Sequence, residues 1–217
     1  MTQDIPLISC VLIYKGNDYN GLLKAIEGFE SQDYDYKELI IVNNRPTQHE
    51  ASTLNIAAKA NVILIDTPIF LPAGTARNFG LSHANGQIIA QFRLDYHYEP
   101  HYLSTLAKAM AAEPASMVML GKTLQYSHIT GNATYQVRGV AVYDTCMFIR
   151  PNGIDYDNID KNEELSLIQK FSHNNMAVSI VNCPKLVIKA IKGPKNTILK
   201  SSVDEEEEAI IAKYLMH

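Results

Sequence analysis

The stretch Gly74-Thr75-Ala76-Arg77-Asn78-Phe79-Gly80, followed by Gly86-Gln87-Ile88-Ile89-Ala90-Gln91-Phe92-Arg93-Leu94-Asp95, decides the fold. Small residues open a helix that carries Arg77, and this helix leads into an apolar run of strand length at 88–92. Asp95 follows directly after that strand. Open α/β sheets bind ligands at the carboxyl ends of their strands. An Arg and an Asp at this edge indicate a phosphate-bearing ligand, with or without a metal ion.

Strand-like and helix-like patterns alternate through the first half of the chain. We expect strands at 7–13, 38–42, 62–65 and 88–92, and helices at about 22–29, 51–59, 72–85 and 103–110. Such alternation is typical of a parallel sheet with right-handed crossovers. The sequence therefore predicts an α/β fold, with a mostly parallel sheet flanked by helices.

The pattern changes after Pro114. We expect strands at 117–120, 133–142, 147–149, 178–181 and 186–191, and a helix at about 162–172. These strands are predicted to extend the first sheet. No linker rich in Gly, Pro or Ser separates the halves, so 1–217 is predicted to be one domain, made of a first half to about 113, a second at about 114–200, and an end helix at about 203–216.

Composition narrows the functional classes. The net charge is −4 and both signs are scattered, which argues against a nucleic-acid binder. No apolar run approaches the ~18 residues of a membrane span. Peripheral membrane contact through the end helix stays open, although no basic face supports it. Cys10, Cys146 and Cys183 lie in apolar runs, which indicates reduced thiols and a cytoplasmic protein.

Several short motifs follow one another in a fixed order. They are the Tyr14–Asn17 loop, Gln32-Asp33-Tyr34, a strand ending in Asn43-Asn44, Ala76-Arg77-Asn78-Phe79-Gly80, Gly86-Gln87-Ile88-Ile89, Arg93-Leu94-Asp95-Tyr96 and Pro100. In this order, over about residues 6–192, the chain resembles the inverting family 2 glycosyltransferases. The resemblance implies a GT-A fold, which is Rossmann-like and binds nucleotide sugars.

The resemblance also implies an activity. The protein is expected to move a sugar from a nucleoside-diphosphate sugar, expected to be a UDP-sugar, to a hydroxyl group with inversion. The acceptor would be a saccharide or glycoconjugate, as in polysaccharide or glycoconjugate synthesis. By this resemblance the first half binds the nucleotide and the second half faces the acceptor.

Three residues match nucleotide-binding positions of the family. Asn43 and Asn44 stand where the family carries acids, and Asn44 is expected at the nucleobase, since an amide can pair with a uracil edge. The alternative is a turn-forming loop without a ligand. Arg77 matches the nucleotide-contacting Arg of the family, and its alternative is a surface Arg on an amphipathic helix.

The metal-binding motif is altered. Asp95 matches the second acid of the family's Asp-x-Asp, which binds Mn²⁺ or Mg²⁺ at the donor diphosphate, but Arg93 replaces the first acid. Three arrangements are open. Asp95 with His97 holds a metal weakly, or Arg93 itself supplies the positive charge at the diphosphate, or Arg93 and Asp95 simply pair and the site is inactive.

The candidate base follows from the same resemblance. Glu163-Glu164 lies where the family has Glu-Asp, whose second acid deprotonates the acceptor hydroxyl, so Glu164 is the expected base. Glu164 shares helical spacing with Leu167 and Phe171, which places it on the inward face. The alternative is structural: acids in a first helical turn complement the dipole, and Asp160-x-x-Glu163 matches a capping box.

Two rival functions remain. The lost acids at Asn43, Asn44 and Arg93 suit a degenerate relative that acts as a binding or assembly subunit. A nucleotidyltransferase of similar fold is the other, although Val11–Gly16 is a poor version of the Gly-rich loop that it needs. No GxGxxG follows the first strand, and no GxxxxGK[ST] is present.

Overall fold

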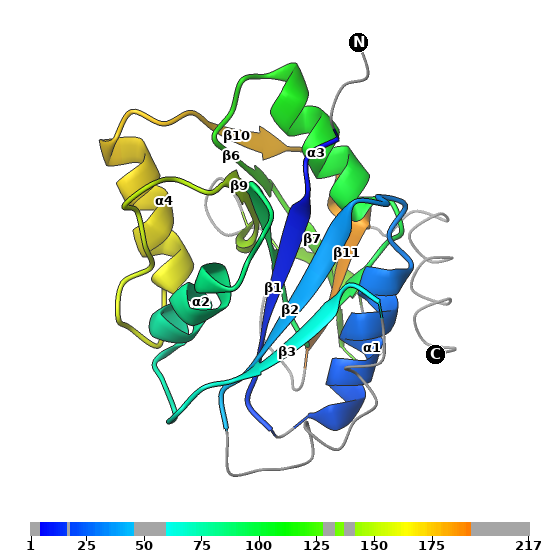
Figure 1. The fold of residues 1–217 in the computed structure, drawn as a ribbon. Coiled ribbons are helices and arrows are strands. Elements are labelled where there is room, and N and C mark those ends of the chain that lie inside the picture. The colour runs from blue at the N-terminus through cyan, green and yellow to red at the C-terminus, as the bar shows by residue number, and fades with distance from the viewer. Residues whose placement is uncertain (1–4, 17, 46–59, 128–132, 137–141, 192–217) are drawn as a thin grey trace.

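A computed structural model of the chain describes residues 5–16, 18–45, 60–127, 133–136 and 142–191. A central sheet with helices packed on both faces dominates the molecule (Figure 1). The predicted α/β class with a mostly parallel, helix-flanked sheet is therefore confirmed. The helices predicted at about 51–59 and 203–216 lie outside the described residues.

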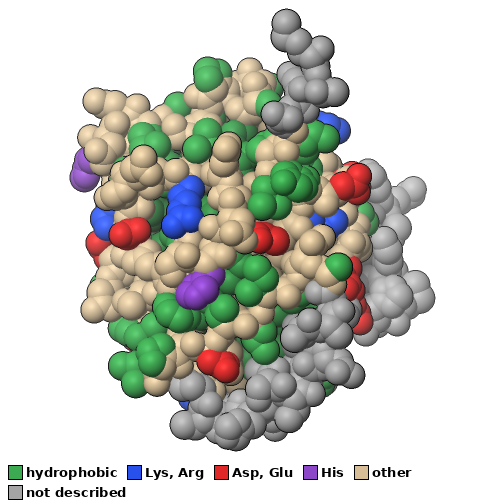
Figure 2. Space-filling model, in the orientation of Figure 1, with side chains coloured by type: hydrophobic (Ala, Val, Ile, Leu, Met, Phe, Trp, Pro, Cys, Tyr) green, Lys and Arg blue, Asp and Glu red, His purple; other side chains and the backbone are tan. Residues whose placement is uncertain are grey.

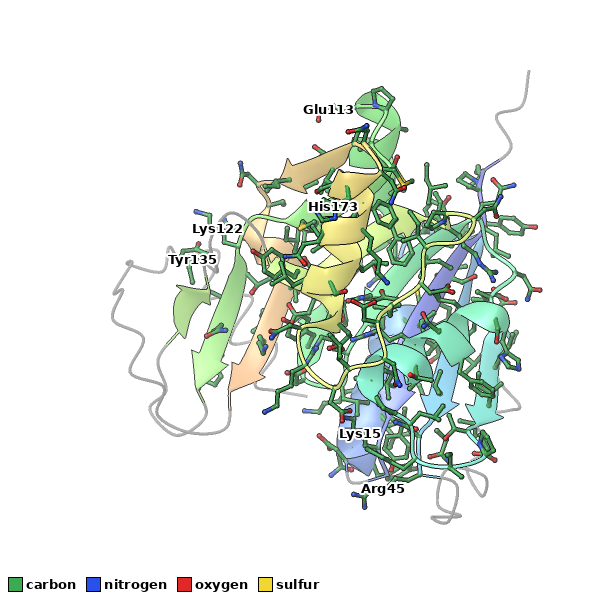
Figure 3. All side chains as sticks on the ribbon, turned by 90° about the vertical axis from the view of Figure 1, so that its left-hand side faces the viewer. Lys15, Arg45, Glu113, Lys122, Tyr135 and His173 are labelled. Atoms are coloured by element: carbon green, nitrogen blue, oxygen red, sulfur yellow. The ribbon has the colours of Figure 1, made fainter. Side chains whose placement is uncertain are left out.

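The main sheet has seven strands. Their order across the sheet is β10 (Val178–Val181), β6 (Met117–Leu120), β9 (Val142–Ile149), β4 (Ile88–Phe92), β1 (Ile8–Tyr14), β2 (Lys37–Asn43) and β3 (Val62–Asp66). Strand β9 is antiparallel to both of its neighbours, and the other pairs are parallel. The carboxyl ends of β1, β2 and β4 consequently lie at one edge, where Lys15 and Arg45 follow β1 and β2 (Figure 3).

Helices cover the two faces of this sheet in pairs. One apolar cluster packs α1 (Tyr19–Glu30) and α3 (Tyr102–Ala112) against one face, and a second packs α2 (Ala73–Ser82) and α4 (Glu163–His173) against the other (Figure 1). Both faces of the central strands are thus buried, which explains their continuous apolar runs. Where α2 crosses the sheet, a Cβ at Gly80 would lie 2.6 Å from Val11 Cγ1 and 2.9 Å from Val42 Cγ2. Only glycine allows this close packing.

A second sheet of four strands was not predicted. Its order is β5 (Tyr96–Tyr98), β11 (Val187–Ile191), β7 (Thr123–Ser127) and β8 (Ala133–Gln136), with a short 3₁₀ turn, η2 (Pro184–Leu186), before β11. The prediction that the second half extends the first sheet is correct for β6, β9 and β10 and wrong for β8 and β11. The strands predicted at 133–142 and 147–149 are described as β8 and as the longer β9. Local apolar pattern does not encode which strands pair.

The motif glutamine Gln32 connects three segments. Its Nε2 donates to the carbonyl oxygens of Gly28 and Glu99, each at 2.9 Å, and its Oε1 accepts from the backbone N–H of Leu103 at 3.0 Å. The last bond satisfies one of the N–H groups that an α-helix leaves unpaired at its start. Gln32 therefore fixes α3 relative to the end of α1.

Charged side chains of both signs lie on the surface, and two of the three free cysteines are buried. Figure 2 shows Lys, Arg, Asp and Glu scattered over one face of the molecule, without a dominant charge. Cys10 and Cys146 are buried free thiols, and burial raises the pKa of both. Among the described residues, the helices are too short or too polar to cross a membrane.

Candidate active site

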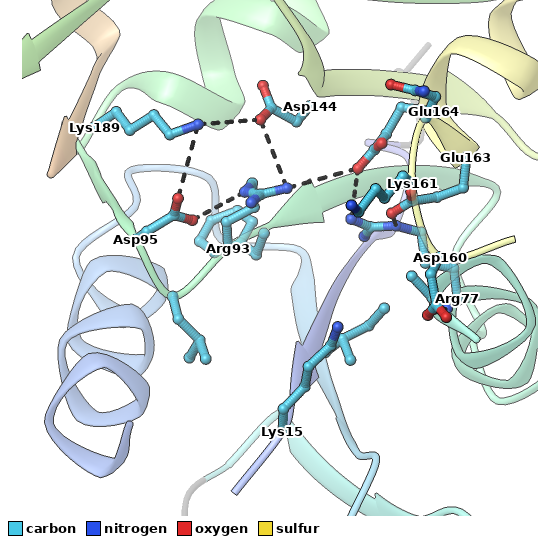
Figure 4. Close-up of a pocket in the computed structure, with 15 residues that line it drawn as sticks. Lys15, Arg77, Arg93, Asp95, Asp144, Asp160, Lys161, Glu163, Glu164 and Lys189 are labelled. Carbon is cyan, nitrogen blue, oxygen red and sulfur yellow. Dashed lines mark hydrogen bonds and ion pairs between the residues drawn. The ribbon is translucent and has the colours of Figure 1, made fainter. Parts of the chain in front are cut away.

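A cavity of about 450 Å³ opens at the carboxyl ends of β1 and β4, next to the first turns of α2 and α4 (Figure 4). Strands β9 and β11 contribute to its wall. Its charged lining comprises Lys15, Arg77, Arg93, Lys161 and Lys189 together with Asp95, Asp144, Asp160, Glu163 and Glu164. The cavity therefore brings the predicted residues Arg77, Arg93, Asp95 and Glu164 into one site.

The start of α2 is docked onto the segment that precedes α4. The backbone N–H of Gly74 donates to the Ile159 carbonyl at 2.9 Å, and that of Ala73 donates to Asp160 Oδ1 at 3.1 Å. A Cβ at Gly74 would overlap the carbonyl oxygen of Asp157. Glycine is thus required at position 74 by the close approach of two segments, and this approach sets the distance between α2 and α4.

Asp160 caps the start of α2 and not the start of α4, the helix for which the sequence offered a capping box. Its carboxylate accepts from the first turn of α2, whereas α4 begins at Glu163. Asn162 precedes α4 in the left-handed region, with φ 62°, and makes no side-chain cap. The capping-box alternative for Asp160 and Glu163 is therefore wrong, because the Asp160 carboxylate accepts its hydrogen bond from α2 and not from α4.

Asn78 holds the same segment from further along α2. Its Nδ2 donates to the Tyr156 carbonyl and its Oδ1 accepts from the Tyr156 N–H, both at 2.9 Å. The Tyr156 hydroxyl accepts a short hydrogen bond from Gln91 Nε2 of β4. The Ala76–Gly80 motif thus has a structural explanation, since Asn78 anchors the loop before α4 while Gly80 packs on the sheet.

Arg77 is buried between the two glutamates of α4. Its Nη2 lies 2.8 Å from Glu164 Oε1 and its Nε lies 3.4 Å from Glu163 Oε1. Burial alone would lower the pKa of Arg77, but the neighbouring charge, chiefly that of Glu164, raises it. Burial raises the pKa of Glu163, and the adjacent Glu164 charge adds to the rise. Arg77 is only 5% exposed, so the alternative of a surface Arg on an amphipathic helix is wrong.

Glu164 lies on the inward face of α4, as predicted. It is buried, and its Oε1 is 3.7 Å from Arg93 Nη1 as well as 2.8 Å from Arg77 Nη2. Both guanidinium groups therefore orient one carboxylate at the cavity wall. Its role as a base, and a nucleotide contact by Arg77, remain predictions.

Beside Glu164, charges of alternating sign form a ring. Arg93 Nε is 3.0 Å from Asp95 Oδ1, and Arg93 Nη1 is 3.6 Å from Asp144 Oδ2. Lys189 Nζ closes the ring at 3.6 Å from Asp144 Oδ2 and 3.8 Å from Asp95 Oδ2 (Figure 4). Burial alone would lower the pKa of Arg93, but Asp95 and Asp144 outweigh it and raise that pKa. Arg93 is therefore permanently charged.

Sequence reasoning missed Asp144 and Lys189. Asp144 interrupts the strand Val-Tyr-Asp-Thr-Cys-Met-Phe-Ile and Lys189 interrupts Val-Ile-Lys-Ala-Ile. A charged residue inside an apolar strand is costly to bury unless it is paired. That signal marks both positions in the sequence, but it does not reveal that they meet each other.

Asn43 and Asn44 serve the neighbouring loop in this structure. Asn44 is buried, donates from Nδ2 to the Leu71 carbonyl at 2.8 Å, and accepts at Oδ1 from the Leu71 N–H at 2.9 Å. Asn43 Nδ2 donates to Asp66 Oδ1 at 2.8 Å. These contacts stabilise the loop after β3, next to the sheet edge. The expected contact of Asn44 with a nucleobase stays a prediction.

Among the residues that the structure describes, the side chains that line this cavity do not fit a divalent metal ion. His97 Nε2 lies 3.3 Å from Glu99 Oε1, and His97 lines a second cavity of about 210 Å³ between α1 and β5. Within the described ranges, no three His, Cys, Asp or Glu side chains are grouped so that they could hold a metal. The carboxylates of Asp95 and Asp144, which are hard ligands suited to Mg²⁺ or Mn²⁺, already face two cations.

Comparison with known proteins gives a matching family model and matching solved structures. The family model described as Glycosyl transferase family 2 matches residues 9–176. No curated protein sequence matches the chain.

The structural matches include S. aureus TarS 1–349 in complex with UDP, with a TM-score of 0.69 and 15% identity over 96% of this chain and 70% of that chain. The same segment in complex with UDP-GlcNAc matches with a TM-score of 0.69, 12% identity, and 96% and 71% coverage. A longer structure of S. aureus TarS matches with a TM-score of 0.67 and 14% identity over 96% of this chain and 43% of that one.

Proposed function

The chain belongs to glycosyl transferase family 2, and on that premise we propose that it transfers a sugar from a UDP-sugar to an acceptor hydroxyl with inversion. One observation carries the proposal: Arg93, Lys189 and the buried Glu164 line a single cavity at the carboxyl edge of a GT-A sheet. This edge is where open α/β sheets bind their ligands.

The donor is proposed from the character of the cavity and from the structural neighbours. Cationic side chains that line the cavity, among them Arg93 and Lys189, suit a diphosphate. Two of the matching TarS structures are complexes, one with UDP and one with UDP-GlcNAc, which supports a uridine nucleotide here. The acceptor is proposed to be a saccharide or glycoconjugate. The free, buried Cys10 and Cys146 support a reducing compartment such as the cytoplasm.

The proposed reaction uses Glu164 as general base. The Glu164 carboxylate takes the proton of the acceptor hydroxyl, whose oxygen attacks the anomeric carbon of the donor. The bond between that carbon and the diphosphate oxygen breaks on the opposite face, so the anomeric configuration inverts and UDP leaves. Arg77 and Arg93 hold the carboxylate in place. Fixed cationic donors stabilise the negative charge that develops on the leaving diphosphate.

A second candidate is a degenerate relative that binds a nucleotide sugar or a partner without catalysis. The observation in its favour is that Glu164 is paired with two guanidinium groups, which compete with an acceptor hydroxyl for its oxygens.

The experiment compares release of UDP with binding of UDP. The protein is incubated with a panel of UDP-sugars and with mono- and oligosaccharide acceptors, and UDP is quantified while calorimetry follows UDP against GDP. The proposed function expects preferential UDP binding together with acceptor-dependent UDP release. Binding without release from any donor would favour the degenerate relative, and absence of nucleotide binding would exclude the proposal.

A further inference from the structure

The ring formed by Arg93, Asp95, Lys189 and Asp144 occupies the diphosphate end of the cavity in the proposed function. Each carboxylate lies within 3.8 Å of both cations. The two cations also share one support, because Arg93 and Lys189 lie over the ring of Tyr96 at 5.5 and 5.1 Å. They are consequently held side by side at the cavity wall.

The charge of this ring matches that of a metal site. Two carboxylates with one divalent ion carry no net charge, and neither do two carboxylates with one Arg and one Lys. The positive charges of Arg93 and Lys189 therefore lie between Asp95 and Asp144, at the place that a metal ion bound by these two acids would occupy. A divalent ion entering this space would meet two like charges while displacing their ion pairs.

We propose, on the basis of the proposed function, that Arg93 and Lys189 together bind the donor diphosphate in place of a divalent cation. Nucleotide binding is then independent of metal. Lys189 is a phosphate-binding residue in this assignment, and Asp95 and Asp144 position the two cations and are not metal ligands.

The exposure and the hydrogen-bond donors of Arg93 and Lys189 suit the binding of a diphosphate. The Arg93 side chain is 29% exposed, so its guanidinium is held by the ring and is still reached from the cavity. A guanidinium offers several N–H donors in a fixed plane that matches phosphate oxygens. Lys189 is more deeply buried, at 10%, and its ammonium presents a concentrated charge where water is scarce. Figure 4 shows Lys15 directed toward the same space from the end of β1.

The first test measures the affinity of the full chain for uridine, UMP and UDP by calorimetry, in EDTA and in Mn²⁺. We expect UDP to bind in EDTA with an affinity within about threefold of that in Mn²⁺. Binding of UDP that requires Mn²⁺ would overturn the inference and leave the proposed function standing. No binding of UDP under either condition would overturn both.

The second test removes and restores the charge. Lys189→Met in EDTA should weaken UDP binding about tenfold to a hundredfold, the usual effect of losing a hydrogen bond to a charged group. Uridine binding, which involves no phosphate, should be retained and shows that the variant is folded. Lys189→Arg should recover part of the loss, and Lys108→Met on the exposed part of α3 is the matched control. Equal losses for uridine and UDP would contradict the assignment.

The third test converts the site. Arg93→Asp removes one cation and places a carboxylate beside Asp95 and Asp144, which creates a set of oxygen ligands suited to Mn²⁺. We expect UDP binding by this variant to become dependent on Mn²⁺, in contrast to the unaltered protein. If the variant and the unaltered protein respond to Mn²⁺ alike, Arg93 does not replace a metal.

Discussion

Glu164 is the residue on which the proposed chemistry depends. Its carboxylate is 2.8 Å from Arg77 and 3.7 Å from Arg93, and its neighbour Glu163 also contacts Arg77, at 3.4 Å. Two adjacent acids therefore share one guanidinium, but only Glu164 also reaches Arg93. This difference allows the two acids to be separated by experiment.

We predict that Glu164→Gln lowers the rate of transfer by about 10²–10⁴, the usual contribution of a general base, and leaves the affinity for UDP unchanged. Gln keeps the shape and one acceptor oxygen but cannot accept the proton. The measurement is kcat for transfer beside calorimetry of UDP. Glu163→Gln is the matched control and should lose far less. Equal losses in both variants would mean that the acids act only by holding Arg77.

At the scale of elements, a buried carboxylate joins β1, β2 and the turn before β4. Glu38 Oε1 accepts from Ser9 Oγ at 2.5 Å and from the Asn85 N–H at 2.7 Å, and its Oε2 accepts from Asn85 Nδ2 at 2.9 Å. Burial alone would raise the pKa of Glu38, but these hydrogen bonds outweigh it and lower that pKa below its ordinary value of 4.5. The turn that leads into β4, and so to Arg93, is fixed by this carboxylate.

Glu38→Gln should reduce the free energy of unfolding by about 1–3 kcal/mol near neutral pH, because its amide N–H₂ would face a donor. A lowered pKa contributes stability that is complete above the ordinary value and is lost as the pH falls through the lowered one. The difference in free energy of unfolding between the unaltered protein and the variant should therefore become smaller in acid. Urea unfolding at about pH 7 and about pH 3.5 measures it, with the exposed Glu27→Gln as control. A deficit that stays constant with pH would contradict this account.

At the scale of the whole molecule, the cavity is assembled from both halves of the chain. Arg77 and Arg93 come from the first half, whereas Asp144, Glu164 and Lys189 come from the second. A ligand that bridges these groups binds the folded protein only, since the unfolded chain does not bring them together.

UDP at about one hundred times its Kd should stabilise the fold by about 2.7 kcal/mol. For a chain of this size that corresponds to a rise in Tm of about 5–10 °C. Thermal unfolding followed by circular dichroism, with uridine and GDP as comparison ligands, measures the shift. A Tm unaffected by UDP at saturating concentration would count against a donor site in this cavity.

The sequence by itself determined the α/β class, the parallel core strands and the order of the motifs, because strand and helix periodicity is local information. It also placed Arg77, Arg93, Asp95 and Glu164 among the site residues, and the structure brings all of them to one cavity. Domain boundaries, the nucleobase contact of Asn44 and the base role of Glu164 stay predictions.

Only the tertiary structure decided which partners these residues meet. It assigned Asp160 to the start of α2, set Arg77 between two glutamates, and added Asp144 and Lys189 to the ring around Arg93. It also separated β11 into a second sheet, which carries Lys189 to the cavity. The physical reason is that ion pairs and strand pairing join residues that are far apart in the chain. Spacing along the sequence predicts only local structure, so it does not predict which of these distant residues contact each other.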